Sequence, residues 1–579
     1  MGEQIMTDHG VEALKIAAAW PGADRATLVT LATVLAGTGA DADGYAYFRD
    51  LAAAQPEQVL PAVLAGFFQV RAGDDVAAGL ARLDAAAGRD LGPPQYYRGL
   101  AIAGLVGLAD DPARAAQAVQ DLEFVLAVKD QFPGQMLRAV QHALVAAYSA
   151  LGRDGDAAAA ASRAGLSGTP AGTRLEFGGF SVSGAEGFRF GSPRIVQPAP
   201  GIQVAQGYDF GDFAFVTTQD GIVAIDAGTA PHRVEAALAA AGLSAGDVRH
   251  VIVTHAHFDH VGGIGAILRP GTRVIAQAGF PAELDQQHVN QVPYRNFTGA
   301  GAGFGNGGPP HPAMIRADVL VAETTTFTIG GTEFVLYPVT GGETTDALMA
   351  YLPASGVLFA GDVLMPYLGA PFFAEGSPDG LLAALKLILE LAPETMVQGH
   401  TVLSDLFTLD AAAGLLDAFT EVRTDALIAI RRGASVTELL AKNYLPEMLR
   451  DHPAAVSPFL AIREHFVQRL HHQHTGYWQA DGQGMEPIGP ADRAAALDLL
   501  AGHEIEPFVQ AVRALLAQRD YALGLEIATA GLACHPGAAE LADLRQQALY
   551  RLLERHQLQD PFRFLIYAEL AGAELGAVA

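Results

Sequence analysis

The chain has 579 residues, half of which are hydrophobic, so it is long enough for about three domains with packed cores. The formal net charge of −27 argues against a nucleic-acid partner and against an anionic membrane surface, because no stripe of Lys and Arg offers the electrostatic footprint that such binding needs. Cys534 is the single cysteine, which excludes a disulfide within the chain.

The N-terminal part of the chain, residues 1–170, is predicted to be a helical domain. It is rich in Ala and Leu at helical spacing and is broken by turns such as Gly92-Pro93-Pro94. Helical hairpins similar to tetratricopeptide repeats fit this pattern, although no strict period is visible. The first residues lack the apolar core of a signal peptide, and no apolar run reaches transmembrane length. We therefore expect a cytoplasmic protein that does not associate with membranes.

Residues 190–405 alternate short apolar strands with helices. Two early strands, 214–218 and 222–228, flank the turn Gln219-Asp220-Gly221, and helices are expected near 232–241 and 380–391. The order of these elements predicts an α/β fold in which two facing sheets lie between helices, an αββα sandwich. From residue 406 to 579 the pattern is helical again, with turns near 444–446, 489–490 and 535–537.

Four metal-ligating side chains lie in the segment His255-Ala256-His257-Phe258-Asp259-His260. The segment follows the β-branched run 251–254 and precedes two glycines, which predicts a buried strand, a loop and the start of a helix. The two histidines at alternate positions leave the strand end on the same side and can share one cation, whereas Asp259 and His260 are displaced enough to hold a second. Imidazole with carboxylate favours zinc, with iron or manganese possible.

Three further candidate ligands follow apolar strands downstream. Glu343 comes shortly after 332–337, Asp362 directly follows 356–361, and His400 ends the segment 395–400. Because α/β sheets present ligands just past their strand ends, these residues are expected to complete a dinuclear site with the histidine-rich segment.

The order of these motifs resembles the metallo-β-lactamase superfamily. Most members carry His where this chain has Glu343, and glutamate there is similar to the zinc-dependent alkylsulfatase branch. The segments 474–482 and 560–570 also resemble the dimerisation domain of alkylsulfatases. The resemblance implies a catalytic domain at 190–405, a helical dimerisation domain at 406–579, and a homodimer. Two departures are Asp362, where alkylsulfatases typically have Glu, and residues 363–373, which lack their His-, Asn- and Arg-rich stretch.

The resemblance also implies roles for individual residues. One zinc would be bound by His255, His257 and Glu343, and the other by Asp259, His260 and His400, with Asp362 as the bridge. Asp259 and Asp362 are therefore the candidate catalytic residues, and Asp226 would orient a ligand by hydrogen bonding. Arg295 would clamp a sulfate. Tyr294, Asn296 and His288 are further candidate substrate-binding residues, and His288 is also a candidate general acid.

The predicted function is a dinuclear zinc hydrolase, in the first place a sulfatase that cleaves alkyl or aryl sulfate esters with a metal-bound hydroxide. The substrate is expected to be a small, anionic ester. An alternative in the same enzyme class is hydrolysis of phosphoesters, lactones, thioesters or β-lactams, because the fold alone does not choose among them. An alternative of another class is a helical-repeat interaction protein with a degenerate metal domain.

Overall fold

The computed structural model describes residues 2–21, 23, 25–85, 94–105, 107–128, 134–163, 175–177, 180–183, 187–190, 193–289, 315–365, 376–442, 445–475, 484–556, 563, 566–567 and 570–571. The chain divides into two compact units. One consists of Met1–Gly178, Leu440–Asn443 and Thr475–Glu574, and the other of Gly179–Leu439, Tyr444–His474 and Leu575–Ala579.

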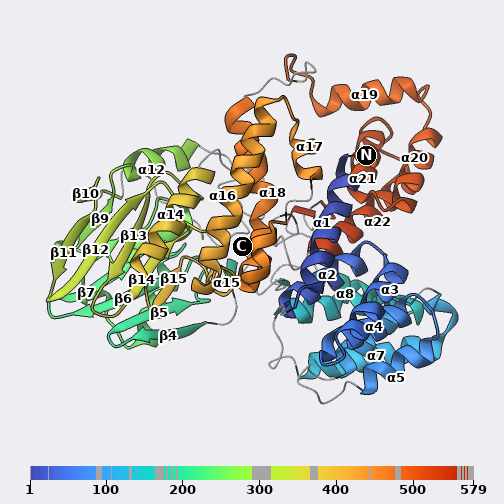
Figure 1. Ribbon diagram of the computed structural model, residues 1–579, viewed down its shortest axis with the longest axis horizontal. Helices are drawn as coiled ribbons and strands as arrows, with labels where there is room; N and C mark the ends of the chain where they lie inside the picture. Colours follow the sequence, from blue (N-terminus) through green and yellow to red (C-terminus); the bar gives the residue numbers. More distant parts are fainter. Residues whose placement is uncertain are drawn as a thin grey trace. The chain divides into compact units, whose positions relative to one another are not determined.

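The first unit is helical, as the sequence predicts for its N-terminal part (Figure 1). Neighbouring helices pack in order along the chain, and Phe48 stacks on Phe68 with ring centroids 5.6 Å apart. The N-terminal helices are α1 Gly2–Ala19, α2 Arg25–Gly37, α3 Asp41–Ala54, α4 Val59–Arg71, α5 Val76–Ala85, α6 Pro94–Ala103, α7 Pro112–Ala127, α8 Gly134–Ala150 and α9 Asp154–Arg163.

C-terminal helices belong to the same unit. They are α19 Pro490–Leu500, α20 Glu506–Ala517, α21 Tyr521–Cys534 and α22 Ala539–His556. α22 packs against α2, and the Tyr521 hydroxyl donates a hydrogen bond of 3.1 Å to the carbonyl oxygen of Thr38. Helices from both ends of the chain therefore share one packed body.

The two large sheets of the described residues lie in the second unit. The seven-stranded sheet has the order β10-β9-β8-β7-β6-β5-β4, antiparallel from β4 to β7 and parallel from β7 to β10. The five-stranded sheet has the order β11-β12-β13-β14-β15, and only its β14–β15 pair is parallel. Their strands are β4 Arg194–Ala199, β5 Ile202–Gln206, β6 Phe213–Thr218, β7 Gly221–Ile225, β8 Val248–Ile252, β9 Arg273–Gln277, β10 Val319–Val321, β11 Thr325–Ile329, β12 Thr332–Val339, β13 Ala347–Leu352, β14 Val357–Gly361 and β15 Thr395–Gln398.

Helices cover the outer faces of both sheets (Figure 1). α10 Pro231–Ala241 and α12 Phe280–Val289 contribute Val234 and Phe280 to an apolar cluster with the seven-stranded sheet, and α14 Pro378–Leu391 packs on β12. A second apolar cluster fills the space between the sheets, with Phe334 and Leu336 fully buried. The predicted αββα sandwich is confirmed.

The helices that follow the sandwich do not form one body with the rest of the C-terminal region. In the second unit, Phe419 of α16 Leu409–Arg431 packs on Phe459 and Phe466 of α18 Pro453–Thr475, with centroids 5.0 and 4.7 Å apart. The compact units therefore follow these apolar surfaces. The division into domains 1–170, 190–405 and 406–579 stays a prediction. The remaining elements are β1 Leu175–Phe177, β2 Phe180–Ser183, β3 Gly187–Phe190, α11 Phe258–Val261, α15 Thr401–Leu406 and α17 Val436–Ala441.

Within the described ranges, none of the helices combines the length and the apolar character that crossing a membrane requires.

Candidate metal centre

The histidine-rich segment leaves the seven-stranded sheet at the end of β8. The strand ends at Ile252, a loop carries His255 and His257, and α11 begins at Phe258. Asp259 and His260 lie in the first turn of α11, with His257 as its N-cap residue. The predicted order of strand, loop and helix is confirmed.

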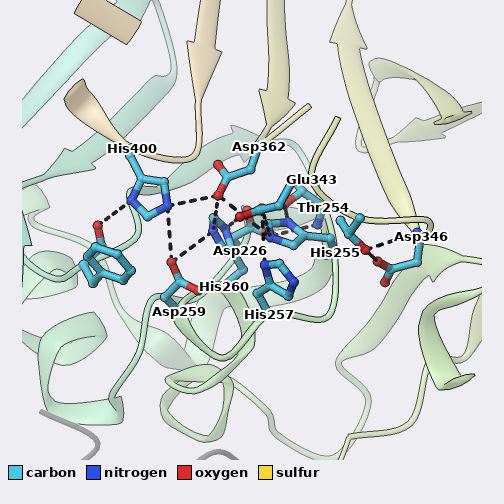
Figure 2. A network of polar contacts seen from close by, with 12 residues as sticks. Asp226, Thr254, His255, His257, Asp259, His260, Glu343, Asp346, Asp362 and His400 are labelled. Atoms are coloured by element: carbon cyan, nitrogen blue, oxygen red, sulfur yellow. Dashed lines mark hydrogen bonds and ion pairs between the residues drawn. The ribbon is translucent and has the colours of Figure 1, made fainter. Parts of the chain in front are cut away.

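The other candidate ligands come from the five-stranded sheet. Glu343 follows β12, Asp362 follows the last residue of β14, and His400 lies between β15 and α15. Figure 2 shows the side chains from both sheets converging on one place. The site therefore lies where the strand ends of the two sheets meet, as the sequence predicts.

The converging side chains form two groups. Within each group, the ligand atoms all lie within 4.8 Å of one another. The three-residue group consists of His255, His257 and Glu343, and the four-residue group of Asp259, His260, Asp362 and His400. In the three-residue group, Glu343 Oε2 lies 3.4 Å from His255 Nε2 and 3.3 Å from His257 Nδ1.

Asp362 is the central carboxylate of the four-residue group. Its Oδ2 atom lies 3.0 Å from His400 Nε2 and 3.3 Å from His260 Nε2. Asp259 Oδ2 approaches the same two nitrogens at 3.3 and 3.5 Å. Asp362 Oδ2 is also 3.9 Å from His255 Nε2 in the other group. This oxygen therefore lies where a ligand shared by two cations would be placed.

A divalent cation fits these side chains. His255 Nε2, His260 Nε2, Glu343 Oε2 and Asp362 Oδ1 are buried and make no hydrogen bond among the described residues. Buried polar atoms normally have a partner, and a cation would supply one to the atoms that face it. Imidazole nitrogens with carboxylate oxygens suit zinc, iron or manganese.

The electrostatics of the four-residue group keep its carboxylates ionised. Burial alone would raise the pKa of Asp362, but His400 and His260 outweigh it and hold this pKa well below its ordinary value. The same two histidines lower the pKa of Asp259 in spite of its burial. Burial would lower the pKa of His260 and of His400, but the carboxylates beside them raise both. Ionised carboxylates are the form that binds a cation.

Hydrogen bonds fix the orientation of the histidines. Phe210 O accepts from His400 Nδ1 at 2.8 Å, and Asp226 Oδ2 lies 2.9 Å from His260 Nδ1. Thr254 Oγ1 lies 3.0 Å from His255 Nδ1 and donates its own hydrogen to Asp226 Oδ2. In these three histidines Nδ1 is thus engaged outward, which leaves Nε2 facing the other candidate ligands. His257 differs, because its Nδ1 atom is the one that faces Glu343.

The sequence profile of the metallo-beta-lactamase superfamily matches residues 207–400, the stretch that contains every candidate ligand. These residues are a metallo-beta-lactamase superfamily domain. Over 320 residues the chain is 23% identical to a linear primary-alkylsulfatase of Pseudomonas sp. (strain ATCC 19151). The matched region covers 50% of this chain and 60% of the alkylsulfatase. It is also 27% identical over 217 residues to a hydroxyacylglutathione hydrolase of Rhodobacter capsulatus, covering 37% of this chain and 68% of that enzyme.

A solved structure shares the fold of this metallo-beta-lactamase domain. The stereoselective inverting sec-alkylsulfatase Pisa1 of Pseudomonas sp. superimposes with a TM-score of 0.56 at 16% identity, over 66% of each chain. The chain is thus similar to two alkylsulfatases, and it matches less than two thirds of the length of each.

Two sets of residues complete the comparison with the sequence-based predictions. Tyr294, Arg295 and Asn296 lie outside the described residues, and so does the side chain of His288, whose backbone belongs to α12. Conversely, sequence reasoning missed Phe210 and Thr254, whose hydrogen bonds hold candidate ligands. Their only signal is position: Thr254 directly precedes the histidine-rich segment, and Phe210 precedes β6 by a few residues.

Proposed function

We propose that this protein is a dinuclear zinc hydrolase that cleaves alkyl or aryl sulfate esters. The observation that carries the proposal is the position of Glu343 beside His255 and His257, because a glutamate in this slot is the feature that resembles the alkylsulfatase branch. Similarity to a linear primary-alkylsulfatase supports the same substrate class.

The two groups would hold one cation each. His255, His257 and Glu343 would bind the first, Asp259, His260 and His400 the second, and Asp362 would bridge them. Three protein ligands with a shared bridge leave positions open for water and substrate, as in catalytic zinc sites. When bound, two such cations lower the pKa of a water molecule and neutralise charge that develops on the leaving oxygen.

The residues of the chain prepare the site for this chemistry. Asp226 and Phe210 O hold protons on the outward nitrogens of His260 and His400, so both rings keep Nε2 free of a proton for the cation that they would bind. Asp259 and Asp362, which are at least 96% buried, keep their carboxylate oxygens in a site shielded from water, where electrostatic interactions are strong. An acidic protein can still accept an anionic ester, because the cations dominate the local field.

Another hydrolase activity of the same domain is the main rival. The similarity to a hydroxyacylglutathione hydrolase favours a thioester among the alternatives. The interaction-protein hypothesis is less well supported, because all seven candidate ligands lie together in the two groups and a decayed site would have lost at least one of them.

A substrate panel tests the proposal. Zinc-loaded protein is assayed against an aryl sulfate, a primary alkyl sulfate, a phosphodiester, a lactone, a β-lactam and a hydroxyacylglutathione. We expect kcat/KM for a sulfate ester to exceed the other values at least about 100-fold, a difference of roughly 2.7 kcal/mol in transition-state stabilisation. Preferred turnover of the thioester would overturn the sulfatase proposal in favour of its rival.

A further inference from the structure

The loop that precedes β6, residues 207–212, contacts the four-residue group without contributing a ligand to it. Phe210 uses its carbonyl oxygen to accept from His400 Nδ1, and its ring lies 4.8 Å from the His400 ring. Phe210 also stacks on Phe258, the residue before Asp259, with ring planes 12° apart.

The next residue of the loop, Gly211, packs against the start of α11. A Cβ atom on Gly211 would lie 2.3 Å from the carbonyl oxygen of Asp259. The absence of a side chain at this position is therefore what lets the loop lie directly against the first turn of α11.

Asp212 fixes the residues on either side of His400. Its backbone N–H donates to Gly399 O at 2.6 Å, and its Oδ2 atom accepts from Thr401 Oγ1 at 2.7 Å. Asp212 is 3% exposed, so these bonds lie in a dry environment where losing one partner is costly. With Phe210 O, three consecutive residues of the chain, 399–401, are each held by the loop.

The loop approaches candidate ligands of the four-residue group, namely Asp259, His260 and His400. In the three-residue group, His255 is held by Thr254, which does not belong to this loop. These contacts place the loop beside the four-residue group.

We infer that Asp212 and Thr401 are positioning residues that set the affinity of the four-residue group for its cation and leave the three-residue group unaffected. The inference rests on the proposed dinuclear site. It does not depend on which ester is cleaved. Supports of this kind change metal affinity by about 10–100-fold when they are removed.

The test is a zinc titration of the full-length protein against a chromophoric chelator, which resolves two binding steps. Thr401→Val removes the hydroxyl donor at nearly constant volume and is expected to weaken one step at least about 10-fold and spare the other. Asp212→Ala should weaken the same step, whereas Thr401→Ser, which keeps the hydroxyl, should restore it. Thr395→Val, at the far end of β15, is the matched control. Amide exchange of α15 gives a second readout and should accelerate in Thr401→Val and Asp212→Ala but not in Thr401→Ser or Thr395→Val.

Each outcome decides something different. Two unchanged zinc steps in Thr401→Val and Asp212→Ala, or equal weakening of both steps, would overturn the positioning role. If one step weakens as expected while the wild type hydrolyses no sulfate ester, the positioning role stands and the sulfatase proposal fails.

Discussion

Thr254 is bound to Asp226 through two hydrogen bonds. Its backbone N–H donates to Asp226 Oδ1 and its hydroxyl to Asp226 Oδ2, both at 2.7 Å. Because the Thr254 hydroxyl donates its one hydrogen to Asp226, its oxygen must accept the hydrogen bond from His255 Nδ1. Asp226 also contacts His260 directly, so one carboxylate supports a histidine in each candidate metal group.

Asp226→Ala is accordingly expected to weaken both zinc-binding steps, each about 10-fold or more. Chelator competition measures both affinities. The control is Asp220→Ala, which removes an exposed carboxylate from the β6–β7 turn, where it accepts from Gly330 N. Weakening of one step alone would show that the Thr254 link carries no support to His255.

Removal of candidate ligands should abolish hydrolysis but not folding. We expect about two zinc equivalents in the wild type and a loss of activity of at least about 1,000-fold in His255→Ala and Asp362→Ala. The fold should persist because the sandwich has its own apolar core, with Phe215 and Phe334 fully buried. His250→Ala, on β8, is the matched control. Metal analysis, a hydrolysis assay and circular dichroism decide; global unfolding of both variants would contradict the expectation.

A substitution that changes no ligand should also damage the site. A Cβ atom on Gly399 would lie 2.1 Å from Asp362 Oδ1 and 2.6 Å from His260 Cε1. Gly399→Ala is therefore expected to displace both side chains and to lower zinc affinity by about 10-fold or more. Gly265→Ala is the control, since a Cβ atom there meets nothing within 4 Å. Equal zinc affinities of the two variants would show that the backbone at Gly399 shifts to accommodate the Cβ atom without displacing Asp362 or His260.

His556, the last residue of α22, should make the helical unit sensitive to acid. Burial first, and then Arg555 and Arg563, lower the pKa of His556 well below its ordinary value. The unfolded state therefore binds more protons below about pH 6.5, and stability is lost as the pH falls below that value. Amide exchange in α22 should accelerate between pH 7 and pH 5, and less so in His556→Gln. Identical acceleration in both proteins would assign the effect to other groups.

The homodimer implied by the alkylsulfatase resemblance remains a prediction. α19 ends in Leu499 and Leu500, which are 67% and 84% exposed, so it offers apolar surface to a second copy. Light scattering at micromolar concentration should give a dimer mass, and Leu499→Glu with Leu500→Glu should shift it towards the monomer. Leu389→Glu on α14, where the side chain is 38% exposed, is the control. A monomeric wild type would end this proposal.

The sequence alone determined which side chains are the candidate metal ligands, because their identities and their positions after apolar strands are local properties. One short segment contains four of them, His255, His257, Asp259 and His260. The other three, Glu343, Asp362 and His400, each follow an apolar run that the sequence predicts to be a strand. The αββα sandwich could be predicted for the same reason, because the spacing of apolar residues along the chain indicates where strands and helices alternate.

Tertiary structure decided which residues support those ligands and which helices pack together. Asp212 meets Thr401 across 189 residues of chain, and nothing in the local pattern around either residue indicates the other. Likewise, Phe419 packs on Phe459 in one unit while α22 packs against α2 in the other. Such contacts depend on how strand ends and apolar helix faces from distant segments are brought together, because periodicity shows that a face is apolar but not which partner buries it.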